Sequence, residues 1–180
     1  MRRVFLIGHG GVGKSTCGPL FAASVGYAFV DLDTEFMRRI GNITAHIEEQ
    51  GYVEYCRANS RLFYALLEEQ QTDTVYALSS GFLVHGEVDP DLAKHQEAIK
   101  LGVSILLLPA ADLAAAEPII VARQLARNLY TSEASQRRTI RERHPRYLAF
   151  GDIQIFSAAP PATIAGLMQA AYLEFLARAS

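Results

Sequence analysis

Short runs of hydrophobic residues alternate along the chain with longer stretches in which apolar side chains recur at helical spacing. The runs predict five strands, at Val4–Ile7, Ala28–Val30, Thr74–Leu78, Val103–Leu108 and Ile153–Phe156. The stretches between and after them predict helices within 14–25, 33–40, 43–70, 90–100, 112–128, 133–144 and 161–178. Helices that connect successive strands favour right-handed βαβ units, so the pattern predicts an α/β fold with a parallel sheet. The 180 residues suit one core, and we expect a single domain, 1–180.

One segment, 111–139, departs from this alternation. It is rich in Ala and Arg and contains Pro118, and it separates the fourth predicted strand from the fifth by more residues than a simple crossover needs. Two interpretations are open. The segment is either an ordinary solvated pair of helices or a mobile lid that closes over a bound nucleotide.

Composition narrows the class of protein. Half of the residues are hydrophobic, a fifth are charged and the net charge is -2, which is typical of a globular protein without a basic surface. We therefore expect neither nucleic acid nor membrane as a partner. The first apolar run stops at Gly8 and no run has the length of a membrane span, so we expect a soluble, cytoplasmic monomer. Cys17 and Cys56 are isolated and the histidines lack ligand spacing, which argues against disulfides and a structural metal.

Residues 8–15 read Gly-His-Gly-Gly-Val-Gly-Lys-Ser and match G-x-x-x-x-G-K-[ST] between a predicted strand and a predicted helix. In such a P-loop the backbone N–H groups cradle phosphates, the lysine reaches the β- and γ-phosphates, and the hydroxyl after it ligates Mg²⁺. The motif predicts an ATP site with Mg²⁺. We interpret His9 as an exposed spacer within the loop. The predicted nucleotide-binding residues are Gly10, Gly11, Val12, Gly13, Lys14, Ser15 and Thr16.

A pair of carboxylates follows the second predicted strand, at Asp31 and Asp33. Alternation along a strand sends both to one face, at the carboxyl edge of the sheet where open α/β folds bind ligands. Taken alone, the pair could be a helix N-cap and a solvated acid. Beside a P-loop, we expect one carboxylate to hold a magnesium-bound water and the other to accept a proton from an acceptor hydroxyl. We assign the magnesium site to Ser15 and Asp31.

With these motifs, the chain resembles the shikimate kinase family, a branch of the nucleoside-monophosphate-kinase-like P-loop folds, over nearly its whole length. The P-loop and Asp31-Leu32-Asp33 stand in the family's order and spacing, and Arg57 stands at the place of an acceptor-binding arginine. Arg127-Asn128-Leu129 resembles the family's lid Arg-Pro-Leu, and Arg143-His144-Pro145-Arg146-Tyr147 resembles its Arg-x-Pro-Leu-Tyr.

The resemblance implies a three-layer α/β/α P-loop kinase fold with a five-stranded parallel sheet and a mobile lid at about 111–139. It implies ATP-dependent phosphoryl transfer to a hydroxyl of a small hydroxy acid, shikimate to shikimate 3-phosphate, in aromatic amino acid biosynthesis. The catalytic residues would be Lys14, Asp33 and Arg127, of which Arg127 closes with the lid onto the phosphates.

The resemblance also implies how the acceptor is bound. Asp33 would bind its hydroxyls and serve as the base, and Ser80 and Gly81 would line its pocket. Arg57 and Arg143 would clamp its carboxylate, because guanidinium forks suit a planar carboxylate.

Three departures from the family pattern leave the acceptor open. Ser79-Ser80-Gly81 stands where the family has three glycines, and Ser60 replaces an acidic residue. Ile120 stands in place of the arginine that flanks adenine, with Arg123 as the nearest substitute. The alternatives are a kinase for another polyhydroxylated carboxylate, such as gluconate, and a nucleotide-binding regulatory module whose catalysis has decayed.

Overall fold

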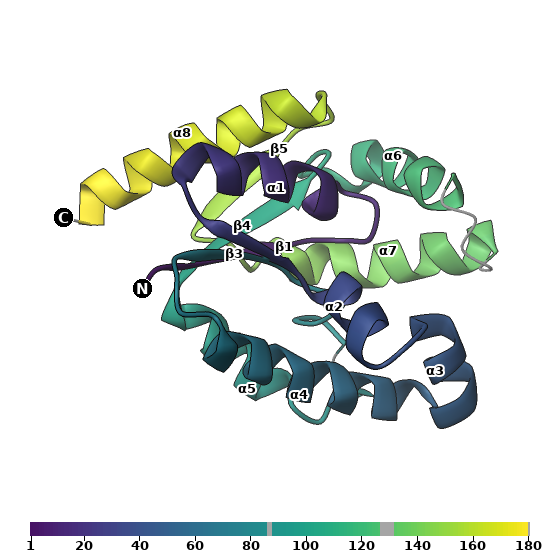
Figure 1. Ribbon diagram of the computed structural model, residues 1–180. Helices are drawn as coiled ribbons and strands as arrows, with labels where there is room; N and C mark the ends of the chain where they lie inside the picture. The colour runs from purple at the N-terminus through teal and green to yellow at the C-terminus, as the bar shows by residue number, and fades with distance from the viewer. Residues whose placement is uncertain (86–87, 127–131, 180) are drawn as a thin grey trace.

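The computed structural model of the chain describes residues 1–85, 88–126 and 132–179. At its centre is a parallel sheet with the strand order β2-β3-β1-β4-β5 (Figure 1). The predicted α/β fold and five-stranded parallel sheet are confirmed. The strands are β1 (Arg3–Ile7), β2 (Ala28–Asp31), β3 (Thr74–Ala77), β4 (Val103–Leu108) and β5 (Ile153–Phe156).

Helices cover both faces of the sheet. On one face lie α1 (Lys14–Val25) and α8 (Pro161–Ala179), and on the other lie α4 (Tyr52–Glu69) and α5 (Leu92–Ala98), which runs into a short 3₁₀ helix, η2 (Ile99–Leu101) (Figure 1). The central strands β1 and β4 are therefore buried on both sides, which explains their continuous runs of apolar residues. None of the described helices is long and apolar enough to cross a membrane.

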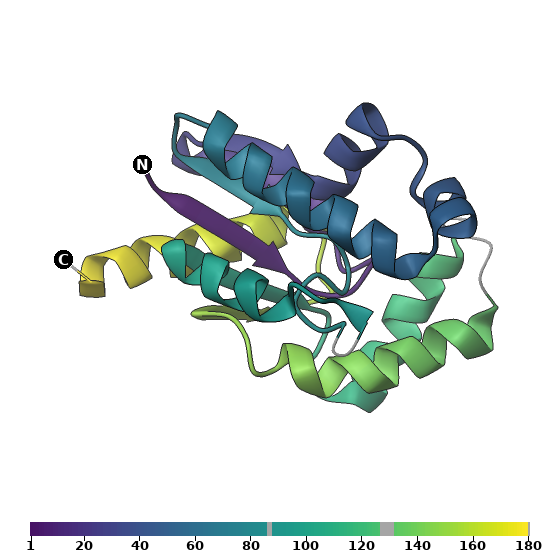
Figure 2. The same cartoon turned by 90° about the horizontal axis from the view of Figure 1, so that it is seen from below.

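The chain leaves β1 towards one edge of the sheet and leaves β4 towards the other, and a crevice opens at the carboxyl ends of such neighbouring strands. The remaining helices gather at this end of the molecule, beyond the ends of the strands (Figures 1 and 2). They are α2 (Leu32–Arg39), α3 (Ile43–Gln50), α6 (Leu113–Leu125) and α7 (Glu133–Tyr147).

Two helices differ from the prediction. The stretch 43–70 is not one helix, because Gly51 takes a positive φ of 85° and separates α3 from α4. The predicted helix 133–144 continues through Pro145, although proline usually ends a helix. Its additional turn buries Tyr147, whose hydroxyl accepts a hydrogen bond of 2.9 Å from the Gly81 N–H. This turn therefore ties α7 to the segment that follows β3.

Candidate active site

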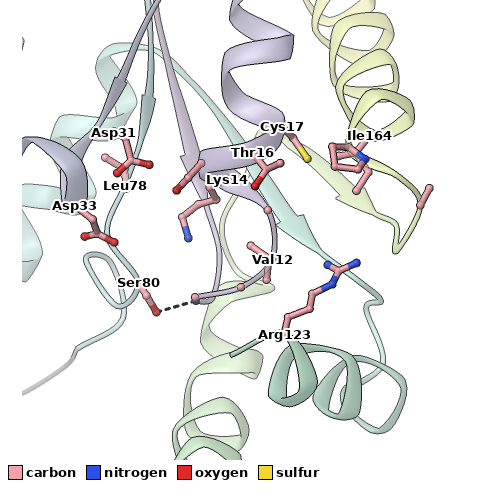
Figure 3. Close-up of a pocket in the computed structure, with 16 residues that line it drawn as sticks. Val12, Lys14, Thr16, Cys17, Asp31, Asp33, Leu78, Ser80, Arg123 and Ile164 are labelled. Carbon is pink, nitrogen blue, oxygen red and sulfur yellow. Dashed lines mark hydrogen bonds between the residues drawn. The ribbon is translucent and has the colours of Figure 1, made fainter. Parts of the chain in front are cut away.

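A cavity of about 400 Å³ lies at the carboxyl end of the sheet, along the P-loop. We call it the P-loop cavity. Asp31 and Asp33 flank it on one side and Arg123 on the other, with Lys14 between them (Figure 3). It is lined by Gly10, Gly11, Val12, Gly13, Lys14, Ser15, Thr16, Cys17, Asp31, Asp33, Leu78, Ser80, Arg123, Ala159, Pro161 and Ile164.

The start of α1 offers donors to this cavity. Gly13 caps the helix without a side-chain hydrogen bond, so no capping side chain competes with a ligand for the N–H groups of the first turn. The Lys14 side chain is buried across the loop, where Nζ donates to the carbonyl oxygens of Gly8 at 2.7 Å and His9 at 2.9 Å. Backbone donors, the positive helix end and an ammonium group thus meet, an arrangement suited to phosphates.

The two carboxylates reach the cavity from different elements. Asp31 ends β2 and caps α2, accepting a hydrogen bond of 3.0 Å from the Thr34 N–H. Asp33 lies in the first turn of α2, so helix geometry and not strand alternation brings it to the side of Asp31. The N-cap interpretation of Asp31 is thus confirmed, and both residues line the P-loop cavity.

The described residues contain no group of three or more His, Cys, Asp or Glu that could hold a metal ion on its own. Mg²⁺ commonly binds with one or two protein oxygens while phosphates and water fill the other positions. The Ser15 hydroxyl and the Asp31 carboxylate both line the P-loop cavity, so these residues fit a magnesium ion delivered with a nucleotide.

The Gly10 peptide is held from both sides. Its N–H donates to Ser80 Oγ at 3.1 Å (Figure 3), and its carbonyl oxygen accepts from Gln124 Nε2 at 2.9 Å. Ser80, which sequence analysis assigned to the acceptor, therefore supports the P-loop. Gln124 lies on α6 and is buried, and no motif indicated it, because only the packing of α6 against the loop reveals its role.

The far end of the P-loop cavity is formed by Arg123 of α6 together with Ala159, Pro161 and Ile164, which precede or begin α8. Arg123 is held there by a hydrogen bond of 3.4 Å from Nη2 to the Ala158 carbonyl oxygen. A guanidinium opposite apolar side chains can bind the faces of a flat aromatic base. Ile120, by contrast, is completely buried in the core.

His9 is not the exposed spacer that the sequence suggested. Its ring is 1% exposed and packs beneath the loop, stacked on His144 at 5.8 Å between centroids and edge-on to Tyr147 at 4.6 Å. Burial, with smaller effects of His144, Lys14 and Arg143, lowers the pKa of His9 to about 3. The imidazole is therefore neutral and supports the loop from behind.

A second cavity, of about 360 Å³, lies between α4, α7 and the segment after β3, and we call it the Arg143 cavity. Arg143 Nη2 lies 3.2 Å from His85 Nδ1. The segment from Ser80 to His85 separates the two cavities, since Ser80 lines one and His85 the other. The Arg143 cavity is lined by Tyr52, Val84, His85, Val88, Glu142, Arg143 and Arg146.

Arg57 does not join Arg143. Its side chain is 53% exposed, lies 3.6 Å from Glu54 and is not among the described residues that line either cavity. The inward face of α4 carries Tyr52, Cys56 and Asn59, at positions i, i+4 and i+7. Arg57 is the residue after Cys56, and the helical rotation of about 100° between neighbouring residues directs it away from this face. The structure therefore does not bring Arg57 to Arg143, and its part in a clamp on a carboxylate stays a prediction.

Gly81 and Arg127 are the remaining predicted site residues. Gly81 lies between the two cavities and binds the Tyr147 hydroxyl. Arg127 lies outside the described residues. Ser60 also turns away from both cavities, because its hydroxyl is 2.9 Å from Nε2 of the buried His95.

Known proteins resemble this chain over most of its length. The family model described as shikimate kinase matches residues 10–170. The chain is similar to the shikimate kinase of Chlorobaculum tepidum, with 30% identity over 157 residues that cover 86% of this chain and 81% of that protein. With the shikimate kinase of Chlorobium chlorochromatii it shares 40% identity over 81 residues, 44% of this chain but only 42% of that protein's length.

The fold is also similar to solved structures. A shikimate kinase from Acinetobacter baumannii in complex with shikimate superposes with a TM-score of 0.76 and 20% identity, covering 97% of this chain and 94% of that one. At that level of identity, the likeness concerns the fold.

Proposed function

The chain belongs to the shikimate kinase family, and on that premise we propose that it transfers the terminal phosphoryl group of ATP to a hydroxyl of a small hydroxy acid, with shikimate as the acceptor and shikimate 3-phosphate as the product. The observation that carries the proposal is the pair of adjoining cavities. One presents a P-loop and two carboxylates, and the other presents an arginine, with only the segment from Ser80 to His85 between them.

In this proposal the P-loop cavity binds the nucleotide. The N–H groups at the start of α1 and Lys14 hold the phosphates, and Arg123 and Pro161 flank the base. Ser15 and Asp31 would hold Mg²⁺, which neutralises charge on the phosphates during transfer. Arg127, at the predicted lid, would add positive charge to the transferring group.

The acceptor would lie between the two cavities, with its hydroxyl towards Asp33 and its carboxylate towards Arg143. Asp33 then accepts the hydroxyl proton as the oxygen attacks the γ-phosphorus atom, and the bond from that phosphorus to the bridging oxygen of the β-phosphate breaks to release ADP. Since phosphoryl transfer needs little covalent chemistry from the protein, positioning and electrostatic stabilisation supply most of the acceleration.

A single experiment tests the proposal. ADP release is measured with ATP, Mg²⁺ and a panel of hydroxy acids that includes shikimate and gluconate. We expect shikimate to stimulate release most strongly. Stimulation by gluconate alone would support phosphoryl transfer but identify gluconate, and not shikimate, as the acceptor. Nucleotide binding without stimulation by any acid would contradict the kinase assignment and favour a regulatory module.

A further inference from the structure

We infer that Tyr52 and His85 complete a carboxylate-binding subsite around Arg143, in which His85 is the residue that positions the guanidinium. This inference rests on the proposed function and deepens it, since neither residue carries a role there. The three side chains come from three elements, the start of α4, the segment after β3, and α7, and they meet in the Arg143 cavity.

The hydrogen bonds fix the proton positions. Arginine has only donors, so the 3.2 Å contact of Arg143 Nη2 requires His85 Nδ1 to accept. The proton of the neutral imidazole is then on Nε2, which contacts the Tyr52 hydroxyl and donates to it. The Tyr52 hydroxyl also lies 3.2 Å from Nδ1. Because Nδ1 already accepts from Arg143 in this arrangement, the hydroxyl proton can turn to a ligand in the cavity.

Electrostatics support these neutral states. Burial, with a smaller effect of Arg143, lowers the pKa of His85 to about 4, so its ring is uncharged near neutral pH. Burial also raises the pKa of Tyr52, so its hydroxyl keeps its proton.

The backbone holds the imidazole in place. A Cβ atom at Gly81 would clash with His85 Nε2, so the ring can lie there only because residue 81 is a glycine. On the other side, Arg146 Nη1 donates to the Val84 carbonyl oxygen at 3.0 Å. Arg146 thereby ties α7 to the residue before His85, and the imidazole that orients Arg143 is itself oriented.

This arrangement indicates the charge of the ligand. A carboxylate partner would cancel the charge of Arg143, whereas the neutral imidazole orients the guanidinium and leaves its charge for the ligand. Arg57, which could have brought a second guanidinium, faces away, and Glu142 on the cavity wall opposes further negative charge. Arg146, the other guanidinium of the lining, is engaged with the Val84 carbonyl oxygen. Arg143 and the Tyr52 hydroxyl are therefore the donors that face a ligand, and this pair suits a monocarboxylate better than a phosphate dianion.

Calorimetry on the full chain with ADP and Mg²⁺ tests the subsite, with shikimate and its uncharged carboxamide as probes. We expect the wild type to prefer shikimate. His85→Phe keeps a ring but removes both nitrogens, and Tyr52→Phe removes the hydroxyl. Each should weaken shikimate binding about tenfold, the scale of one charge-assisted hydrogen bond, and His85→Phe should also reduce the preference for shikimate. His85→Asn retains an acceptor for Arg143, so it should restore much of the affinity for shikimate and much of the preference for shikimate over the carboxamide.

The matched control is Tyr27→Phe, because the Tyr27 hydroxyl bonds to that of Tyr172, 3.1 Å away, outside both cavities. It should leave both affinities unchanged, and all variants should bind ADP normally. Equal binding of shikimate by His85→Phe and wild type would overturn the inference, as would a wild type that binds both probes alike. Binding of shikimate without its phosphorylation would support the subsite and contradict the proposed function.

Discussion

Lys14 places a side-chain cation in the P-loop cavity, and its Nζ donates to the carbonyl oxygens of Gly8 and His9. Because its charge stabilises the phosphoryl group in the transition state, we expect Lys14→Ala to lower kcat/KM by at least about a hundredfold. ADP release is the measurement. The matched control is Lys94→Ala, because Lys94 is an exposed lysine paired with Asp91. This variant should leave kcat/KM unchanged. Normal turnover by a folded Lys14→Ala protein would contradict the kinase assignment.

Asp33 has a different role in the proposal, since it takes the proton from the acceptor. Asp33→Asn keeps the shape and loses the base, so kcat should fall by about a hundredfold or more while the KM for ATP changes little. Steady-state kinetics against both substrates separate these effects. The control is Asp112→Asn, because Asp112 caps α6 and lines neither cavity among the described residues. If Asp33→Asn changed only the KM for ATP, Asp33 would serve the nucleotide and not the acceptor.

At the scale of the elements, Gln124 connects α6 to the P-loop through the Gly10 carbonyl oxygen. Gln124→Leu keeps the bulk but leaves that carbonyl without its partner, so the Gly10 peptide loses one of the two hydrogen bonds that hold it. We expect the KM for ATP to rise about fivefold, the scale of one neutral hydrogen bond, while acceptor binding stays the same. Gln169→Leu removes a similar bond, to the Ser24 carbonyl oxygen at the α1–α8 contact, and should have no effect on kinetics. Identical kinetic constants for both variants would argue against this support.

The elements also show what sequence could and could not predict. Runs such as Val103–Leu108 predicted the strands because parallel strands are buried on both faces. The P-loop was predictable because its phosphate chemistry depends on a contiguous motif. The outward direction of Arg57 was not predictable, because the face of α4 that a residue occupies depends on single-residue register. About a hundred degrees of helix rotation separates the buried Cys56 from Arg57. His85 and Gln124 belong to no motif, since only tertiary packing brings them to the site.

An ion-pair cluster joins α6 to α7. Arg137 Nη1 and Arg141 Nε of α7 lie 2.5 Å and 2.7 Å from the Glu117 carboxylate of α6. Hydrogen bonds from Arg141 and Arg137 lower the pKa of Glu117 from 4.5 to about 2. A carboxyl group whose pKa is depressed on folding stabilises the protein above its unfolded-state pKa, and this stabilisation is lost as the pH falls towards the folded-state value.

We therefore expect Glu117→Gln to lower the Tm near neutral pH and to lose less Tm than the wild type between about pH 4.5 and about pH 2. Thermal unfolding at several pH values measures both. Glu174→Gln is the control, because Glu174 pairs with Arg178 on the exposed side of α8, where ion pairs contribute little. A Glu117→Gln curve parallel to that of the wild type would show that the cluster does not contribute through Glu117 ionisation.

On the scale of the whole molecule, some helices pack on a face of the sheet, and others lie beyond the carboxyl ends of its strands. α1 and α8 pack together on one face of the sheet, whereas α6 and α7 extend beyond the strand ends (Figure 1). The P-loop cavity contacts α6 through Arg123, and the Arg143 cavity contacts α7 through Arg143. A nucleotide and an acceptor bound together would therefore contact α6, which lies within the predicted lid 111–139, and α7, which begins within it.

This placement predicts that the segment 111–139 closes and becomes ordered when both ligands bind. Hydrogen exchange of the full chain, alone and with a non-hydrolysable ATP analogue, Mg²⁺ and shikimate, measures the change. We expect amides of 111–139 to exchange more slowly with both ligands than with the nucleotide alone, because only the ternary state engages α6 and α7 together. The amides of α8 beyond its first turn are the internal control and should not change, since they lie outside both cavities. Equal protection of 111–139 in all states would identify the segment as an ordinary helix pair. The active site would then have to exclude water from the transferring phosphoryl group without closure of a lid.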